Sequence, residues 1–412
     1  MLFNPFTPSE IASDPDDFFG RNEELRLLER SIQQGSVVIQ GPVGIGKSSL
    51  LSRVRLHMEG FQSDHKSRSL VVVGNRNIET IDQAAHLLLS ELIEVDEQHR
   101  KIGLKIGPVF EFESSEIIHN FKEGRHLAVL KRLLESDYFD RLTEGADFLI
   151  LAVDEADKCP VPLARLIRSV STVTQQQGIK GIRFALAGVT PFFKHVVDED
   201  AGVSRFFYKN INLLPMRPEE ADELLHVKLA KVASEAKKLR IEVNVEPELV
   251  ARIVDLSGGH PHLLQLLGSH LIENEDANPD GIIDKYDLAN SLRKICYEDR
   301  GSVYESVLHR LEIHGKLDAF KLVISNMAPG FPSRISRSAT LDLIATSDAE
   351  WLIENSVLSM PTPIEYGLVD EFIRARIILD AAETEADQIS EEEYLLETSA
   401  GPEDEDWEPS DK

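Results

Sequence analysis

The chain has 412 residues, of which 42% are hydrophobic and 28% are charged, and its net charge is −27 at pH 7. This length predicts two or three soluble domains with real cores, and no stretch approaches the ~18 uncharged apolar residues that a membrane span needs. The acidic, proline-broken N-terminus is neither a secretory signal nor a basic transit peptide, and two distant cysteines are typical of a reducing compartment, so we expect a cytoplasmic protein.

Much of the negative charge is local. Residues 381–412 carry 13 acids and one lysine, which accounts for 12 of the 27 net negative charges. We expect this tail to be disordered and interpret it as a solvating appendage, with binding of a basic partner or mimicry of nucleic acid as the alternatives. A protein that grips duplex DNA through many phosphates usually has a basic face, so the charge makes DNA binding possible but not favoured.

Five short apolar runs in the first half predict the strands of a parallel sheet covered by helices on both faces, which is an α/β fold. These predicted strands span 37–39, 70–73, 148–153, 184–187 and 211–214. Helices are expected over 48–58, 81–92 and 162–177. A hairpin of unknown role is expected at 103–112, inside an insertion at 101–117.

After Met216 the pattern becomes helical. Helices are predicted over 218–239, 248–255, 261–273 and 286–296. Further helices and two short strands, at 357–360 and 364–367, then predict a winged helix. The expected organisation is an α/β domain at 1–215, a helical lid domain at 216–300, a winged helix at 301–380 and the tail at 381–412.

Residues 41–48 read Gly-Pro-Val-Gly-Ile-Gly-Lys-Ser and match G-x-x-x-x-G-K-[ST] at every fixed position, between a predicted strand and a predicted helix. The glycines let backbone N–H groups point at phosphates, Lys47 neutralises the β- and γ-phosphates, and Ser48 offers a hydroxyl to Mg²⁺. A glycine-rich turn that carries Lys-Ser by chance is the alternative. The predicted nucleotide contacts here are Gly41, Pro42, Val43, Gly44, Ile45, Gly46, Lys47, Ser48 and Ser49.

An acidic pair, Asp154 and Glu155, follows the third apolar run. Ligands of parallel sheets bind at the carboxyl ends of the strands, so these acids are expected beside the phosphates. Asp154 would hold Mg²⁺, and Glu155 would polarise the attacking water as general base. The alternative is that Asp154 only caps the next helix. Asp157 and Lys158 are interpreted as a solvated turn.

Several further motifs accompany these: Asn4-Pro5-Phe6, then Phe19-Gly20-Arg21-Asn22-Glu23-Glu24-Leu25, and Gly258-Gly259-His260-Pro261 in the helical domain. Together with the phosphate loop and the winged helix, they resemble the AAA+/STAND group of ATPases, close to archaeal-type ATPases and replication-initiator AAA+ proteins. The resemblance covers residues 1 to about 380 and implies ATP as the nucleotide. It implies that Phe19, Gly20 and Arg21 line the adenine and ribose side, and that His260 and Pro261 close the lid over the base.

The resemblance also implies two catalytic roles. Thr190, just after the fourth strand, is similar in position to the polar sensor of the γ-phosphate, although it could simply start a turn before Pro191. Arg205, in Ser204-Arg205-Phe206, resembles the arginine finger that a subunit supplies to its neighbour in a homo-oligomer. A surface arginine is the plain alternative.

His260 and His262 could suggest a metal site, but they lack an acid or cysteine to complete it, so they are interpreted as lid residues. One departure qualifies the resemblance. Initiators usually carry an arginine where this chain has Gly259-His260-Pro261, which favours a STAND-like switch over an initiator.

The candidate recognition helix, 347–355, carries three acids and no Lys or Arg, and residues 301–380 carry 7 basic and 11 acidic side chains, a net of −4. We therefore expect the winged helix to pack on the ATPase domain or on a protein effector. The small basic clusters that leave non-specific DNA contact open are Arg334, Arg337, Arg374 and Arg376.

The sequence thus predicts a Mg²⁺-dependent, ATP-hydrolysing switch whose nucleotide state controls a protein partner or self-assembly. Two alternatives are kept. One is a DNA-associated AAA+ ATPase of the initiator, helicase-loader or transposition-regulator type, and the other is a non-hydrolysing nucleotide sensor in a defence complex.

Overall fold

The computed structural model describes residues 2–12, 15–59, 67–91, 93–96, 101–104, 115–135, 139–140, 143, 146–179, 181–327 and 334–381. Within these residues the chain forms two compact units. One comprises residues 7–224 together with 260–263, and the other comprises the chain up to Phe6, residues 225–259 and the chain from Leu264 onward. Of the tail predicted at 381–412, residues 382–412 lie outside the described residues, as does most of the predicted hairpin.

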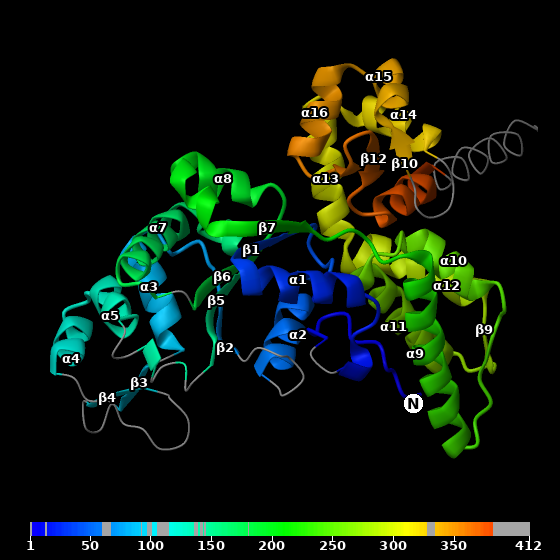
Figure 1. The fold of residues 1–412 in the computed structure, drawn as a ribbon. Helices are drawn as coiled ribbons and strands as arrows, with labels where there is room; N and C mark the ends of the chain where they lie inside the picture. The colour runs from blue at the N-terminus through cyan, green and yellow to red at the C-terminus, as the bar shows by residue number, and fades with distance from the viewer. Residues whose placement is uncertain are drawn as a thin grey trace, which may run out of the picture. The chain divides into compact units, whose positions relative to one another are not determined.

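A five-stranded parallel sheet forms the centre of the first unit (Figure 1). Its strands, in spatial order, are β2 (Ser67–Val73), β5 (Phe148–Asp154), β6 (Ile182–Gly188), β1 (Ser36–Gln40) and β7 (Phe207–Asn212). The predicted α/β fold is confirmed, and four strands lie where the apolar runs place them. The fifth begins at Phe207, four residues before its prediction, because polar Lys209 and Asn210 interrupt β7 and Ile211 is its one fully buried residue.

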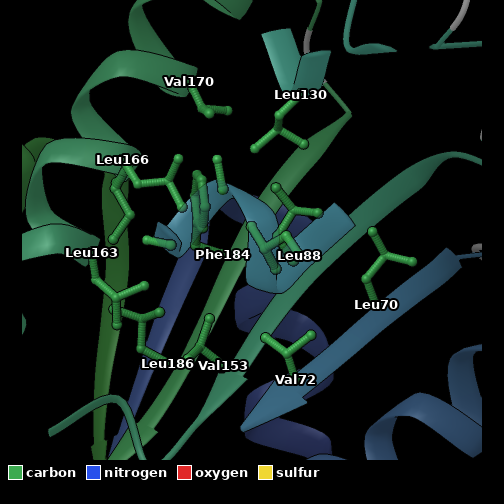
Figure 2. Close-up of a cluster of buried hydrophobic side chains, with 14 of the residues drawn as sticks. Leu70, Val72, Leu88, Leu130, Val153, Leu163, Leu166, Val170, Phe184 and Leu186 are labelled. Atoms are coloured by element: carbon green, nitrogen blue, oxygen red, sulfur yellow. The ribbon is translucent and has the colours of Figure 1, made fainter. Parts of the chain in front are cut away.

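Helices cover both faces of the sheet. Side chains that alternate along the strands pack on one face against α3 (Ile81–Ser90), α5 (His126–Leu133) and α7 (Pro160–Gln176), and Figure 2 shows part of this cluster around Phe184. On the other face they pack against α1 (Asn22–Gln34) and α2 (Lys47–Glu59). This double burial explains why the inner strands are continuously apolar.

Shorter elements complete the first unit. They are the 3₁₀ turns η1 (Pro15–Asp17), η3 (Ala156–Lys158) and η4 (Ala201–Phe206), the helices α4 (Ser115–Lys122) and α8 (Phe192–Glu199), and a hairpin of β3 (Ile93–Asp96) and β4 (Lys101–Leu104). In the hairpin Ile93 pairs with Leu104. The structure therefore has a hairpin that begins ten residues earlier than predicted, while residues 105–112 of the predicted one lie outside the described part of the chain.

Four helices carry most of residues 218–294. They are α9 (Pro218–Lys238), α10 (Leu249–Ser257), α11 (Pro261–Ala277) and α12 (Lys285–Lys294), with a two-residue parallel pairing of β8 (Asn244–Val245) and β9 (Ile282–Ile283). The N-terminal Asn-Pro-Phe motif packs within this unit. Asn4 Nδ2 donates to Ser269 Oγ at 2.9 Å, Lys228 Nζ donates to Pro5 O at 2.6 Å, and the Phe6 ring fills the space beside Gly268. The motif is therefore a packing element.

The C-terminal part begins with a π-helical turn, η5 (Ile295–Asp299), and α13 (Gly301–Ile313). It continues through α14 (Leu317–Asn326), β10 (Arg334–Ser336), α15 (Arg337–Leu343), α16 (Thr346–Glu354), β11 (Leu358–Thr362), β12 (Glu365–Leu368) and a helix over 372–381. The three strands form an antiparallel sheet in the order β10-β12-β11. Sequence patterning gave no sign of β10, since it is three residues long and only Ile335 is fully buried. Within the described residues, no helix is long and apolar enough to cross a membrane.

Candidate nucleotide-binding site

The phosphate loop joins β1 to α2. The strand ends at Gln40, the helix begins at Lys47, and residues 41–46 form the turn between them. Gly44 and Gly46 have φ values of +77° and +97°, which side-chain-bearing residues rarely adopt. Glycine at these two positions therefore lets the loop curl and direct its amides toward one point.

Lys47 lies folded against its own loop. Its ammonium donates to the carbonyl oxygens of Gly41 at 2.9 Å and Pro42 at 2.7 Å. Burial lowers the pKa of Lys47, while the negative charges of Asp154, then Asp157 and Glu155, act in the opposite direction. The lysine thus lies within electrostatic range of the acids that follow β5.

The acidic pair stands at the carboxyl end of β5, as predicted from the apolar run before it. Asp154 is the last residue of the strand and is buried, and its Oδ1 accepts the backbone N–H of Glu155 at 2.9 Å. Glu155 is exposed and left-handed, with φ +49° and ψ +36°. A non-glycine residue in this region costs free energy, and such strain is common at functional positions.

Arg21 ties the loop to the rest of the sheet. Its backbone is also left-handed, at φ +59°, and its guanidinium is buried. That group donates to Ile45 O at 3.2 Å and to Leu214 O, and it pairs with Glu24 at 2.9 Å. Arg21 therefore holds the phosphate loop against the segment that follows β7. A further role on the adenine side stays a prediction.

The two predicted residues before Arg21 lie in different surroundings. Gly20 has φ +62°, and a Cβ there would lie 2.9 Å from Glu220. Phe19, beside it, is half-buried. Close packing rather than conformational freedom alone thus requires glycine at position 20.

His260 and Pro261 lie in the same compact unit as the phosphate loop. A Cβ on Gly44 would lie 3.0 Å from His260 Cε1 and 2.8 Å from His262 Cβ, so both histidines press on the loop's second glycine. The ring of His262 also hydrogen-bonds Pro8 O at 3.0 Å. Pro261 is the first residue of α11, where a proline costs no helical hydrogen bond.

Ser48 and Ser49 occupy the first turn of α2. Ser49 Oγ accepts the backbone N–H of Ala12 at 3.1 Å, so this hydroxyl fixes the N-terminal segment. Ser48 stands next to Lys47 at the helix N-terminus, where the predicted metal contact requires it.

Thr190 and Arg205, the two residues with predicted catalytic roles from the resemblance, lie in different segments of this unit. Thr190 is exposed just beyond β6, the strand that pairs with both β1 and β5, so it lies at the same edge of the sheet as the loop and the acids. Arg205 lies in η4, and its guanidinium packs over the Phe206 ring, 4.8 Å from the centroid.

Sequence analysis missed two polar residues at this edge. Gln40 is buried at the end of β1, donates to Asn210 Oδ1 at 2.9 Å and accepts the N–H of Phe193 at 3.3 Å. Asp157 was wrongly interpreted as part of a solvated turn. Its Oδ1 accepts the N–H of Val189 at 3.0 Å, across the gap between two strand ends. A polar residue directly before the loop was the available signal for Gln40, but no pattern identified the partner of Asp157.

The chain was compared with family models, with curated proteins and with solved structures. No family model matches the chain, and no curated protein matches it. Among solved structures, a Walker-type ATPase of Pyrococcus abyssi has a TM-score of 0.55 at 15% identity, covering 89% of this chain and 98% of that one. The Aeropyrum pernix ORC2 protein, solved in ADPNP-ADP complexes, has a TM-score of 0.52 at 14% identity, covering 90% and 98%. The chain thus shares the P-loop NTPase fold of these two structures.

Proposed function

We propose that this chain is a Mg²⁺-dependent ATPase of the AAA+/STAND type, which uses nucleotide state to control a protein partner or its own assembly. The observation that carries this proposal is the juxtaposition at the sheet edge. A half-buried lysine, at the start of the helix that follows β1, lies within electrostatic range of an acidic pair at the end of β5, with β6 between the two strands. This is the arrangement that phosphoryl transfer needs, because positioning and charge stabilisation supply most of its catalysis.

The loop would bind the phosphates. The ammonium of Lys47, now bonded to two loop carbonyls, would exchange them for the more strongly accepting β- and γ-phosphate oxygens. Loop amides and the N-terminus of α2 would add further positive potential.

The donors present also fit Mg²⁺. The ion prefers oxygen ligands and retains waters and substrate phosphates, so it needs only one or two protein groups. Ser48, beside Lys47, and Asp154, whose charge acts on Lys47, supply a hydroxyl and a carboxylate. Waters and the phosphates of the nucleotide would complete the shell. Bound Mg²⁺ would neutralise the charge of the phosphates.

Glu155 would act on the water. Its exposed carboxylate, just beyond the metal-binding aspartate, is placed to orient the nucleophile and accept its proton. Thr190, at the same edge, would contact the γ-phosphate or the water. Arg205 would act on the nucleotide of a neighbouring copy.

ATP is the proposed nucleotide. The Aeropyrum pernix ORC2 protein, which has the same fold, was solved in ADPNP-ADP complexes, and this supports an adenine base. Competition of ATP and GTP for the purified chain tests the preference directly. Equal affinity for both would remove the adenine assignment.

The described C-terminal elements support a winged helix: β10 lies between α14 and α15, and β11 and β12 follow α16 and complete a small antiparallel sheet with β10. Its surface does not favour DNA. Three of the four arginines considered for phosphate contact are engaged locally: Arg334 pairs with Glu365 at 3.2 Å, Arg374 with Glu371 at 3.6 Å, and Arg376 with Asp380 at 2.8 Å. We therefore propose a protein effector or self-assembly as the output of the switch, with a lid at 216–300 and the winged helix at 301–380.

The deciding experiment measures ATP hydrolysis per molecule against protein concentration, with and without duplex DNA, beside the Glu155→Gln variant. We expect Mg²⁺-dependent turnover that rises with concentration and is lost in Glu155→Gln, which still binds ATP. Stimulation by DNA would favour the DNA-associated alternative. ATP binding with no turnover at any concentration would favour the non-hydrolysing sensor, and rapid turnover by Glu155→Gln would remove its assignment as base.

A further inference from the structure

The turn that carries Glu155 is held from one side by the neighbouring strand. Beyond the end of β2, the N–H of Gly74 donates to Asp154 O at 2.8 Å. A Cβ on Gly74 would lie 2.7 Å from Glu155 O and 3.2 Å from Cys159 Sγ. The backbone of the turn therefore fits closely against the end of β2.

From the other side the same turn is held by Asp157. This residue lies in η3, two positions after Glu155, and its Oδ1 accepts the N–H of Val189, the first residue beyond β6, at 3.0 Å. A Cβ on Gly188 would lie 2.7 Å from the Phe192 ring and 3.0 Å from that oxygen, so the ring and the carboxylate together occupy space that only glycine leaves open. Close packing against Gly188 therefore accompanies the hydrogen bond between Asp157 and Val189.

Val189 directly precedes Thr190, the proposed sensor. The far end of this loop is fixed separately, because the N–H of Phe193 donates to Gln40 Oε1 beside the phosphate loop. Within the described residues, the Asp157 carboxylate is the side chain that links the turn of Glu155 to the near end of the Thr190 loop.

We propose that Asp157 is a positioning residue for hydrolysis, which fixes Thr190 relative to Glu155. This inference rests on the proposed ATPase function. Asp157 touches neither nucleotide nor water in this role, so it should affect turnover far more than nucleotide affinity. Misplacement of a reacting group by about 1 Å can cost on the order of 100-fold in rate.

The test uses three substitutions in the full chain. Asp157→Ala removes both the hydrogen bond and the charge, and we expect kcat to fall about 10- to 100-fold with ATP affinity little changed. Asp157→Asn keeps an accepting oxygen but loses the charge, and should restore most of the rate. Asp157→Glu keeps the charge but carries an extra methylene into the space beside Gly188, and should stay slow.

Asp82→Ala is the matched control. Asp82 also accepts a backbone N–H from another segment, that of Leu127 at 2.9 Å, but it lies on α3, outside the site residues. This variant should lose thermal stability without losing kcat. Rates are divided by the fraction of chain that binds ATP, so that loss of folded protein is not counted as loss of turnover.

Wild-type and Glu155→Gln rates are measured first. If wild type turns over no faster than Glu155→Gln, the ATPase proposal itself has failed. If wild type is active and Asp157→Ala matches it, only the positioning role is wrong. An active Asp157→Glu beside a slow Asp157→Asn would also overturn the positioning role. Turnover would then depend on the negative charge of Asp157, which acts on Lys47, and not on its hydrogen bond.

Discussion

The ammonium of Lys47 donates to the carbonyl oxygen of Pro42 at 2.7 Å, so the residue proposed to bind phosphate is hydrogen-bonded to its own loop. This contact and the bond to Gly41 O give a half-buried charge two acceptors, since a charge taken out of water is costly unless it is hydrogen-bonded. When phosphate binds, its oxygens would replace these carbonyl oxygens as the acceptors of the Lys47 ammonium. The side chain of Lys47 and the loop carbonyls would then have to rearrange together.

The first prediction concerns this lysine. Lys47→Ala should weaken MgATP binding by about 10- to 100-fold, the value of a charge-assisted hydrogen bond, without unfolding the sheet. Titration with a fluorescent ATP analogue measures the change, and Lys194→Ala, an exposed lysine of α8, is the control. Equal affinities in the two variants would contradict the phosphate-binding role.

Gly44 provides a second test. Gly44→Ala would force a Cβ into φ +77° and against the side chain of His262, so both the fold of the loop and its affinity for ATP should suffer. Gly178→Ala is matched in φ, at +73°, but its Cβ would meet open space. It should cost about 1–2 kcal/mol in the free energy of unfolding and leave ATP binding unchanged. An unaffected Gly44→Ala would mean that the loop does not adopt this geometry.

Phe184 tests the core beneath the site. The ring is buried on β6 among leucines and valines of β2, α3 and α7 (Figure 2). Phe184→Ala should destabilise this unit by about 3–5 kcal/mol, since the cavity cannot close fully. Chemical denaturation followed by circular dichroism reports the loss, and Leu27→Ala, partly exposed on α1, should change stability much less. Similar midpoints for both variants would show that the packing is wrong.

A pH effect is expected from the packing of α3 on α5. Asp82 accepts His126 Nδ1 at 2.7 Å, and the rings of His126 and His86 lie 4.4 Å apart. Partial burial, with the charge of His126, lowers the pKa of His86 from 6.5, although Asp82 opposes this. Between the lowered pKa of His86 and 6.5, the unfolded chain binds more protons at this residue than the folded chain does. The contribution of neutral His86 to the free energy of unfolding is therefore full above 6.5 and decreases as the pH falls below it.

The variant His86→Gln removes that contribution. Its melting temperature should fall less than that of wild type between about pH 7.5 and about pH 5.5. His309→Gln, an exposed histidine of α13, is the control and should follow wild type. The histidine pair would be ruled out as the source if His86→Gln and wild type lost stability in parallel.

The sequence allowed the sheet and the phosphate loop to be predicted because each has a local signature. Buried strands are continuously apolar, and Gly41 to Ser48 fit a motif whose geometry depends on backbone alone. Asp154 and Glu155 were placed for the same reason, since the run before them ends at the ligand-binding edge of the sheet.

What could not be predicted depends on distant residues. The bonds of Asp157 to Val189 and of Gln40 to Phe193 join segments that no sequence period relates. The start of β7 was misplaced because an edge strand buries one face at most, and its exposed Tyr208 and Asn210 hide the pattern. Arg21 illustrates the same limit, because its motif marks the position but not the two carbonyls that its guanidinium contacts.

At Glu155 the backbone conformation that is unfavourable for stability coincides with the side chain proposed to activate water. Glycine adopts φ +49° without the penalty that a side chain incurs, so Glu155→Gly should relieve the strain and melt at the same temperature as wild type or higher. The same change removes the proposed base. Selection for thermal stability alone would therefore favour loss of the residue to which we assign the activation of water.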